Sequence, residues 1–184
     1  MIRLVLAIAA ASLTVPVVAQ EAPYPEETRF VPAEHGASAC WGASFFDTGR
    51  QISTMDFAIT FEDIPPGTSE EWPEGRQFFN YELDATLADG TEGLAAGTCR
   101  GAEDGGIVCE VECDGGGATI RLDADGKAMV DIGTYGFIRL RDCGAERNGV
   151  VLEATADDSV FELEPLPAGQ CEPVIRRDYL AGVD

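Results

Sequence analysis

Hydrophobic and polar residues alternate along two long stretches of this chain. Apolar residues stand at every second position of 55–61, and the same spacing returns over 79–87. An alternation with a period of two is typical of β-strands that bury one face. We therefore predict two long strands in these stretches, joined by the Pro-rich, acidic segment 62–77.

The remainder of the chain carries shorter runs of the same kind, and helical periodicity is hard to find beyond residue 20. Turns such as Asp89-Gly90 and Asn148-Gly149 separate the runs, and such dipeptides are strong hairpin signals. The pattern predicts an all-β fold, a single antiparallel domain of about 8–10 strands arranged as a barrel or a sandwich. The further strands are expected at roughly 94–100, 107–113, 118–123, 128–132, 135–142, 149–155 and 158–164.

One hairpin can be predicted at the level of its register. Residues 124–126 fit a three-residue loop in which Gly126 takes the left-handed conformation. With that loop, apolar residues of the two strands face one another on one side of the sheet only. The expected partners are Asp123 with Lys127, Leu122 with Ala128, and Ile120 with Val130.

The first residues have the layout of a secretory signal peptide. Arg3 is followed by an apolar stretch that ends in small residues, just before a plausible cleavage point. The apolar run is shorter than the ~20 residues that a membrane span needs. We expect a signal peptide over 1–19, an extended lead-in over 20–38, and an all-β domain over 39–184. The mature protein would then be periplasmic or secreted, with no insertion in a membrane.

The charge of the chain limits its partners. With 33 acidic and 12 basic residues, the net charge is −21. Nucleic acids and anionic membrane surfaces would repel such a protein, so the charge argues against both as partners. It does not distinguish a small ligand from a protein partner, and we expect a monomer.

Six cysteines in an exported chain predict a framework of three disulfides. Cys109 and Cys113 would lie ~13 Å apart along one strand, beyond the reach of a disulfide. A hairpin instead brings Cys99 opposite Cys109, and this is the first bridge that we expect. The remaining bridges would then be Cys113–Cys143 and Cys40–Cys171.

The sequence contains no recognisable catalytic motif. The only histidine, His35, lies in the lead-in, where a solvent-exposed side chain is expected, and no Cys-x-x-Cys pair suggests a metal site. Asp123 and Asp125 resemble the start of a calcium-binding loop, but Gly126 comes too early and the hairpin explains the same residues. We therefore assign no catalytic residue, no metal ligand and no cofactor.

Arg139 and Arg141 alternate with apolar residues in the expected strand 135–142. Its register is open, because the turn at Gly133-Thr134 allows either face to point inward. If the arginines point inward, their guanidinium groups would hold an anionic ligand in a barrel cavity. The alternative is an exposed face on which they pair with carboxylates.

Trp72 is the third candidate ligand-binding residue. It lies in the segment 62–77, between the two longest strands. A long loop of this kind can act as a lid or as a contact for a partner. The alternative is that Trp72 folds back to cover apolar surface.

Three classes of function are compatible with these features. We expect first a non-catalytic exported module that binds a small ligand or a protein. The second is a carboxylate-dependent secreted hydrolase, because glycosidase-type chemistry needs only two carboxyl groups. The third is an inhibitor of a hydrolase, which would present the loop Gly101–Gly106 braced by the bridge Cys99–Cys109.

The expected architecture resembles that of lipocalin-like barrels, as an all-β chain of this size with a disulfide between its first and last strands. Trp41-Gly42 reverses the order of the Gly-x-Trp that opens that family. The resemblance therefore brings no site residue to this chain, and an architecture alone does not give a function.

Overall fold

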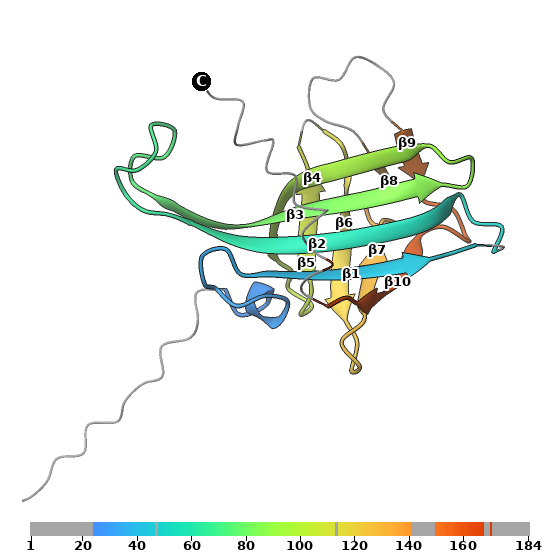
Figure 1. The fold of residues 1–184 in the computed structure, drawn as a ribbon, viewed down its shortest axis with the longest axis horizontal. Helices are drawn as coiled ribbons and strands as arrows, with labels where there is room; N and C mark the ends of the chain where they lie inside the picture. The colour runs from blue at the N-terminus through green and yellow to red at the C-terminus, as the bar shows by residue number, and fades with distance from the viewer. Residues whose placement is uncertain (1–23, 47, 113, 141–149, 168–169, 171–184) are drawn as a thin grey trace, which may run out of the picture.

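The computed structural model describes residues 24–46, 48–112, 114–140, 150–167 and 170. In these residues eight strands close into an antiparallel barrel, and two more strands form a separate sheet (Figure 1). The barrel strands are β1 (Ser38–Ser44), β2 (Ile52–Ile64), β3 (Arg76–Leu87), β4 (Glu92–Gly101), β5 (Ile107–Val111), β6 (Gly117–Leu122), β7 (Ala128–Asp131) and β10 (Val160–Pro165). The separate sheet consists of β8 (Phe137–Leu140) and β9 (Val150–Glu153), and a short 3-10 helix, η1 (Glu27–Arg29), precedes β1.

The barrel is an up-and-down arrangement that is completed by the last strand. From β1 to β7 each strand pairs with the next one along the chain, and β10 then pairs with both β7 and β1. The prediction of a single antiparallel all-β domain is confirmed, and its architecture is a barrel and not a sandwich. A closed barrel leaves no unpaired edge strand.

The hairpin between β6 and β7 has the predicted register, in which Ile120 pairs with Val130. Its loop residue Gly126 has a φ of 84°, the left-handed conformation that this loop requires. The carboxylate of Asp123 accepts a hydrogen bond from the N–H of Asp125 at 2.8 Å. The two aspartates that resemble a calcium-binding loop therefore stabilise the turn.

The interior of the barrel is filled with large side chains. Alternate residues of β2 and β3 point inward and are almost completely buried. Eight-stranded barrels of this kind are just wide enough for side chains to fill them. The largest fully buried side chains include Tyr81, Phe57, Phe61, Phe79 and Phe161.

One end of the barrel is closed by the chain that precedes β1. Phe30, directly after η1, is buried in the core. The ring of Tyr24 packs edge-on against that of Phe79, with ring centroids 5.5 Å apart. Glu27 in η1 accepts a hydrogen bond from the N–H of Gly101 at 2.6 Å. The described part of the predicted lead-in thus covers this end of the barrel.

The sheet of β8 and β9 covers the opposite end. Ile138 and Leu140 of β8 and Leu152 of β9 are at most 2% exposed, and β8 contacts β3, β4 and β6. A side chain at Gly93 would collide with Leu140, so glycine at this position lets β8 approach the start of β4. The packed interior is therefore closed at both ends.

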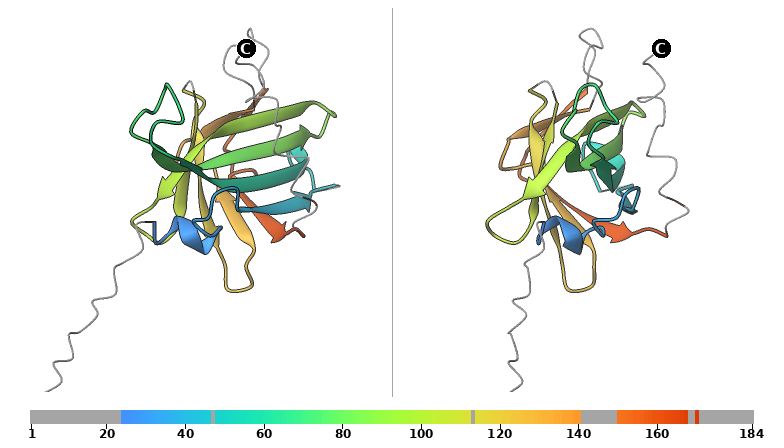
Figure 2. Two further views of the ribbon diagram at one scale, coloured as in Figure 1. Left: turned by 60° about the vertical axis from the view of Figure 1, so that its left-hand side comes forward. Right: turned by 90° about the vertical axis from the view of Figure 1, so that its left-hand side faces the viewer.

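The ends of β2 and β3 project beyond the barrel (Figures 1 and 2). The two strands stay paired out to Ile64 and Arg76. By contrast, β1 begins opposite Thr60, and β4 pairs with β3 only from Phe79 onward. We call this projecting hairpin, residues 62–78, the arm.

The Cys99–Cys109 disulfide is present, as the sequence predicts. The two residues lie directly opposite each other on β4 and β5, with Cα atoms 4.1 Å apart. Cys99 is 7% exposed and Cys109 is 0% exposed, because both side chains belong to the packed core. The bridge therefore joins two neighbouring strands from the inside of the barrel.

The other two predicted bridges involve residues that the structure does not describe. Cys40 on β1 is buried and disulfide-bonded, but its predicted partner Cys171 lies outside the described residues. Cys113 and Cys143 lie outside them as well. Within the described residues, Cys99–Cys109 is the one disulfide with both members visible, in place of the three expected.

We predict that replacing Cys99 and Cys109 together with alanine destabilises the barrel. The bridge closes a loop between residues that are 10 positions apart, and disulfides typically contribute about 2–4 kcal/mol to the free energy of unfolding. Urea denaturation followed by tryptophan fluorescence measures the difference. Equal stability of the variant and the wild-type protein would contradict this prediction.

We predict that Tyr81→Phe preserves the fold and raises the free energy of unfolding by about 1 kcal/mol. The hydroxyl of Tyr81 has no hydrogen-bond partner among the described residues, although Tyr81 is only 2% exposed. Burial raises the pKa of this phenol well above its usual value. Leaving such a hydroxyl unsatisfied costs about 1–3 kcal/mol. A variant that unfolds at lower urea concentration than the wild type would show that the hydroxyl is satisfied in solution.

Candidate functional site

Arg139 does not point into the barrel. In β8 the buried residues are Ile138 and Leu140, so the register is the one that places the arginine on the other face. There its Cζ lies 5.7 Å from the centroid of the Phe137 ring. Burying two aliphatic side chains is favoured because a buried guanidinium group would lose its hydration. Arg141, the second candidate, lies outside the described residues.

Trp72 lies in the loop of the arm and is half-buried. Its ring contacts that of Phe78, with centroids 5.8 Å apart. The guanidinium group of Arg76 lies over both rings, 5.2 Å from the centroid of Trp72 and 5.1 Å from that of Phe78. We call these three residues the aromatic cluster. Trp72 thus packs against the arm and still leaves part of its surface in contact with solvent.

The loop that carries Trp72 is braced by its own backbone. The N–H of Gly67 donates to the carbonyl of Pro73, and the N–H of Gly75 donates to that of Trp72, both at 2.9 Å. Gly75 has a φ of 78°, and a side chain there would lie 2.7 Å from the carbonyl oxygen of Ile64. Glycine is therefore required at this position, and the loop holds the aromatic cluster in a defined arrangement.

Exposed carboxylates flank the aromatic cluster. Glu70, Glu71 and Glu74 are in the loop of the arm and are exposed; we call them the acidic rim. None of the three forms an ion pair with another described residue. At the base of the arm, Nδ1 of His35 accepts a hydrogen bond from the N–H of Asp63 at 3.1 Å. The single histidine therefore helps to fix the arm to the lead-in.

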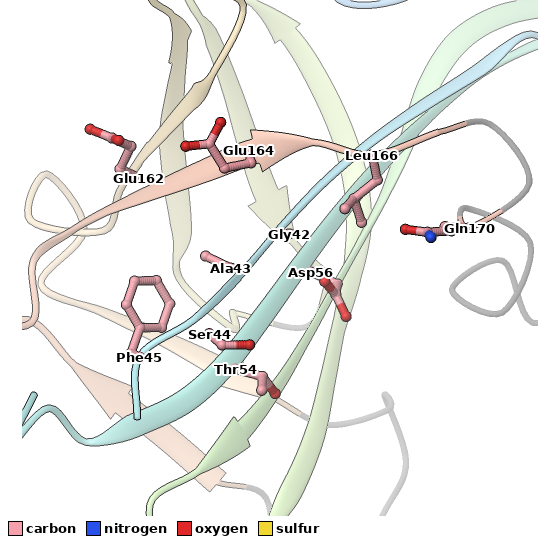
Figure 3. Close-up of a pocket in the computed structure, with 10 residues that line it drawn as sticks. All are labelled: Gly42, Ala43, Ser44, Phe45, Thr54, Asp56, Glu162, Glu164, Leu166 and Gln170. Atoms are coloured by element: carbon pink, nitrogen blue, oxygen red, sulfur yellow. The ribbon is translucent and has the colours of Figure 1, made fainter. Parts of the chain in front are cut away.

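A second candidate site is an open groove of about 800 Å³ on the outer face of β1, β2 and β10 (Figure 3). The carboxylate of Asp56 and the hydroxyl groups of Ser44 and Thr54 line it. Gly42 lies beside Asp56 on the neighbouring strand, and any side chain there would overlap with Asp56 Oδ1 and with Leu166. The absence of a side chain at Gly42 therefore makes room for the Asp56 carboxylate.

Asp56 has the surroundings of a carboxyl that resists ionisation. Burial raises its pKa above the usual value. Asp56 also lies directly opposite Asp84 on β3, and Cβ atoms of opposed residues are about 4.5–5.5 Å apart. Two carboxyl groups this close can divide the roles of acid and base where their surroundings differ. Asp56 is one of 33 acidic residues, and no local pattern distinguishes it from the others, so sequence reasoning misses it.

The loop Gly101–Gly106 is fastened to the barrel. Arg29 donates a hydrogen bond to the carbonyl of Gly105 at 2.9 Å, and Asp104 forms an ion pair with Arg121. The loop is therefore held rigidly, as an inhibitory loop would be, but Ala102, Glu103 and Asp104 provide no aromatic or basic side chain to anchor it in a target.

We predict that Asp56→Asn stabilises the protein at neutral pH and loses this effect in acid. The folded state raises the pKa of Asp56, so it favours the protonated carboxyl group. The stability that this group contributes is complete below the unfolded-state pKa and is lost as the pH rises through the folded-state pKa. Asparagine stays neutral and keeps that stability at neutral pH. The side chain is only partly buried, so the gain at neutral pH is within about 0.5 kcal/mol. Urea unfolding at neutral and acidic pH measures it, and a gain that persists unchanged in acid would refute the explanation.

Other kinds of site have no counterpart in the described part of the chain. No group of three or more histidine, cysteine, aspartate or glutamate side chains there is arranged to hold a metal ion. None of the described helices is long and apolar enough to cross a membrane.

Comparison with known proteins finds no family model, no curated protein and no solved structure that matches this chain.

Proposed function

We propose that this chain is an exported, non-catalytic module that binds another protein through its outer surface. One observation carries the proposal: a packed, closed barrel supports an arm that presents an ordered aromatic cluster to solvent. Partly exposed tryptophan and arginine side chains are typical of protein-binding surfaces. The signal peptide expected over 1–19 supports export.

The packed interior argues against a small ligand inside the barrel. Barrels that bind small molecules keep a cavity with a few polar groups, whereas Phe57, Phe61 and Phe79 occupy the interior here. Arg139 faces away from the core, so it is not available to hold an anion there. The geometry therefore supports binding of a partner on the outer surface of the barrel.

The second candidate is a hydrolase that uses Asp56 and Asp84. The two residues face each other across β2 and β3, Asp56 lines a groove, and its raised pKa suits a general acid. The groove is open, however, and water in an open groove screens charges, which weakens the electrostatic stabilisation of a transition state there. We therefore prefer the binding module.

Native mass spectrometry tests the proposed function. The mature protein would be purified from the exported fraction of its own host after mild chemical cross-linking, and its complexes weighed intact. We expect complexes with another protein chain and no bound small molecule. Recovery of the chain with a small molecule attached, or as a free monomer alone, would refute the proposal.

Assays of hydrolysis distinguish the second candidate. The wild-type protein and Asp56→Asn would be incubated with a panel of aryl glycosides and aryl esters. We expect no hydrolysis above the rate in buffer from either protein. Turnover by the wild type that disappears in the variant would favour the hydrolase over the binding module.

A further inference from the structure

We infer that the arm binds a segment of a partner protein in which lysine or arginine side chains flank an apolar side chain. This inference rests on the proposed function and adds the surface used and the chemistry of the partner. Two observations on the described residues carry it. The first is the aromatic cluster, and the second is the unpaired acidic rim beside it.

The aromatic cluster has the composition and the exposure of an interface centre. Tryptophan and arginine are among the residues that most often dominate binding energy. Trp72 and Phe78 are half-buried and Arg76 is exposed, so a partner can cover them without any change in the barrel. Phe78 is available because its neighbour Phe79 takes the inward position on β3.

The shape of this surface is set before a partner binds. The hydrogen bonds from Gly67 to Pro73 and from Gly75 to Trp72 close the loop on itself. The guanidinium group of Arg76 lies over both rings. A surface that is already ordered loses little conformational entropy on binding, which favours affinity.

The acidic rim has no basic side chain of its own. Arg76 is the only lysine or arginine in the arm, and it lies over the rings and not against a carboxylate. On the barrel wall, by contrast, Lys127 lies 2.7 Å from both Glu162 and Glu164. The negative charge of the rim is therefore left without a counter-charge among the described residues, and a basic partner would supply one.

Charge decides between the possible occupants of the arm. A second copy of this chain would bring another acidic rim and another net charge of −21, which opposes self-association. Nucleic acids and anionic lipid surfaces carry the same sign of charge. A basic protein segment is attracted to the rim, and its apolar side chain would cover the exposed surface of Trp72.

Selection of peptides tests the inference. A displayed library of random linear peptides would be selected on the immobilised, disulfide-bonded mature chain. We expect the enriched peptides to combine basic residues with an aromatic or aliphatic residue. For the tightest of these peptides, Trp72→Ala should weaken binding by roughly tenfold or more. Combined Glu70→Gln, Glu71→Gln and Glu74→Gln should weaken binding and reduce its salt dependence.

Phe46→Ala is the matched control. Phe46 is 67% exposed and follows the end of β1 that lies away from the arm, so its removal should leave peptide affinity unchanged. Trp72→Phe keeps an aromatic ring and should retain most of the affinity. Circular dichroism and urea unfolding of each variant separate a lost contact from a lost fold.

The inference would be overturned if the enriched peptides were acidic or uncharged. It would also be overturned if this chain enriched no peptides beyond those enriched by an unrelated protein of similar charge. A selected peptide that binds the Trp72 and glutamine variants as tightly as the wild type would have the same consequence. The proposed function has a separate fate. If the peptide test fails but native mass spectrometry still finds a protein complex, the partner binds elsewhere on the barrel. If native mass spectrometry finds no complex, the proposed function itself fails.

Discussion

The seam between β1 and β10 is the contact on which the rest of the structure depends. Two residue pairs join these strands, Trp41 with Pro165 and Gly42 with Glu164, and they convert an open sheet into a closed cylinder. Closure removes the two edges of the sheet and fixes its diameter, and an eight-stranded cylinder of this kind has room for little more than side chains. Because those side chains fill it, only the outer surface of the barrel is left open to other molecules.

Local patterns predicted the features that depend on neighbouring residues. Alternation located β2 and β3. Turn chemistry placed β6 opposite β7, and a short hairpin placed Cys99 opposite Cys109, because a tight loop allows few registers. These patterns do not distinguish a barrel from a sandwich. That distinction depends on whether β1 and β10 pair, and these strands are far apart in the sequence.

Features that depend on distant residues were not predictable in this way. A strand with one apolar face has the same alternation whether it forms the wall or covers an end, so nothing local marks β8 and β9 as lying outside the barrel. Asp56 is distinguished by residues that the fold brings beside it, namely Gly42, which leaves room for its carboxyl group, and Asp84 on β3. The sequence singled out Trp72 by its position in a long loop, and the structure adds Arg76 and Phe78 as its neighbours.

The inward direction of the Cys99–Cys109 bridge imposes an order on the maturation of this chain. Both residues lie in a packed core, so no oxidising or isomerising enzyme can reach their sulfur atoms once β10 has joined β1. A chain that closed first would bury two thiols, and the barrel would have to open around β4 and β5 to expose them. An enzyme that forms this bridge would therefore act most readily before the barrel closes.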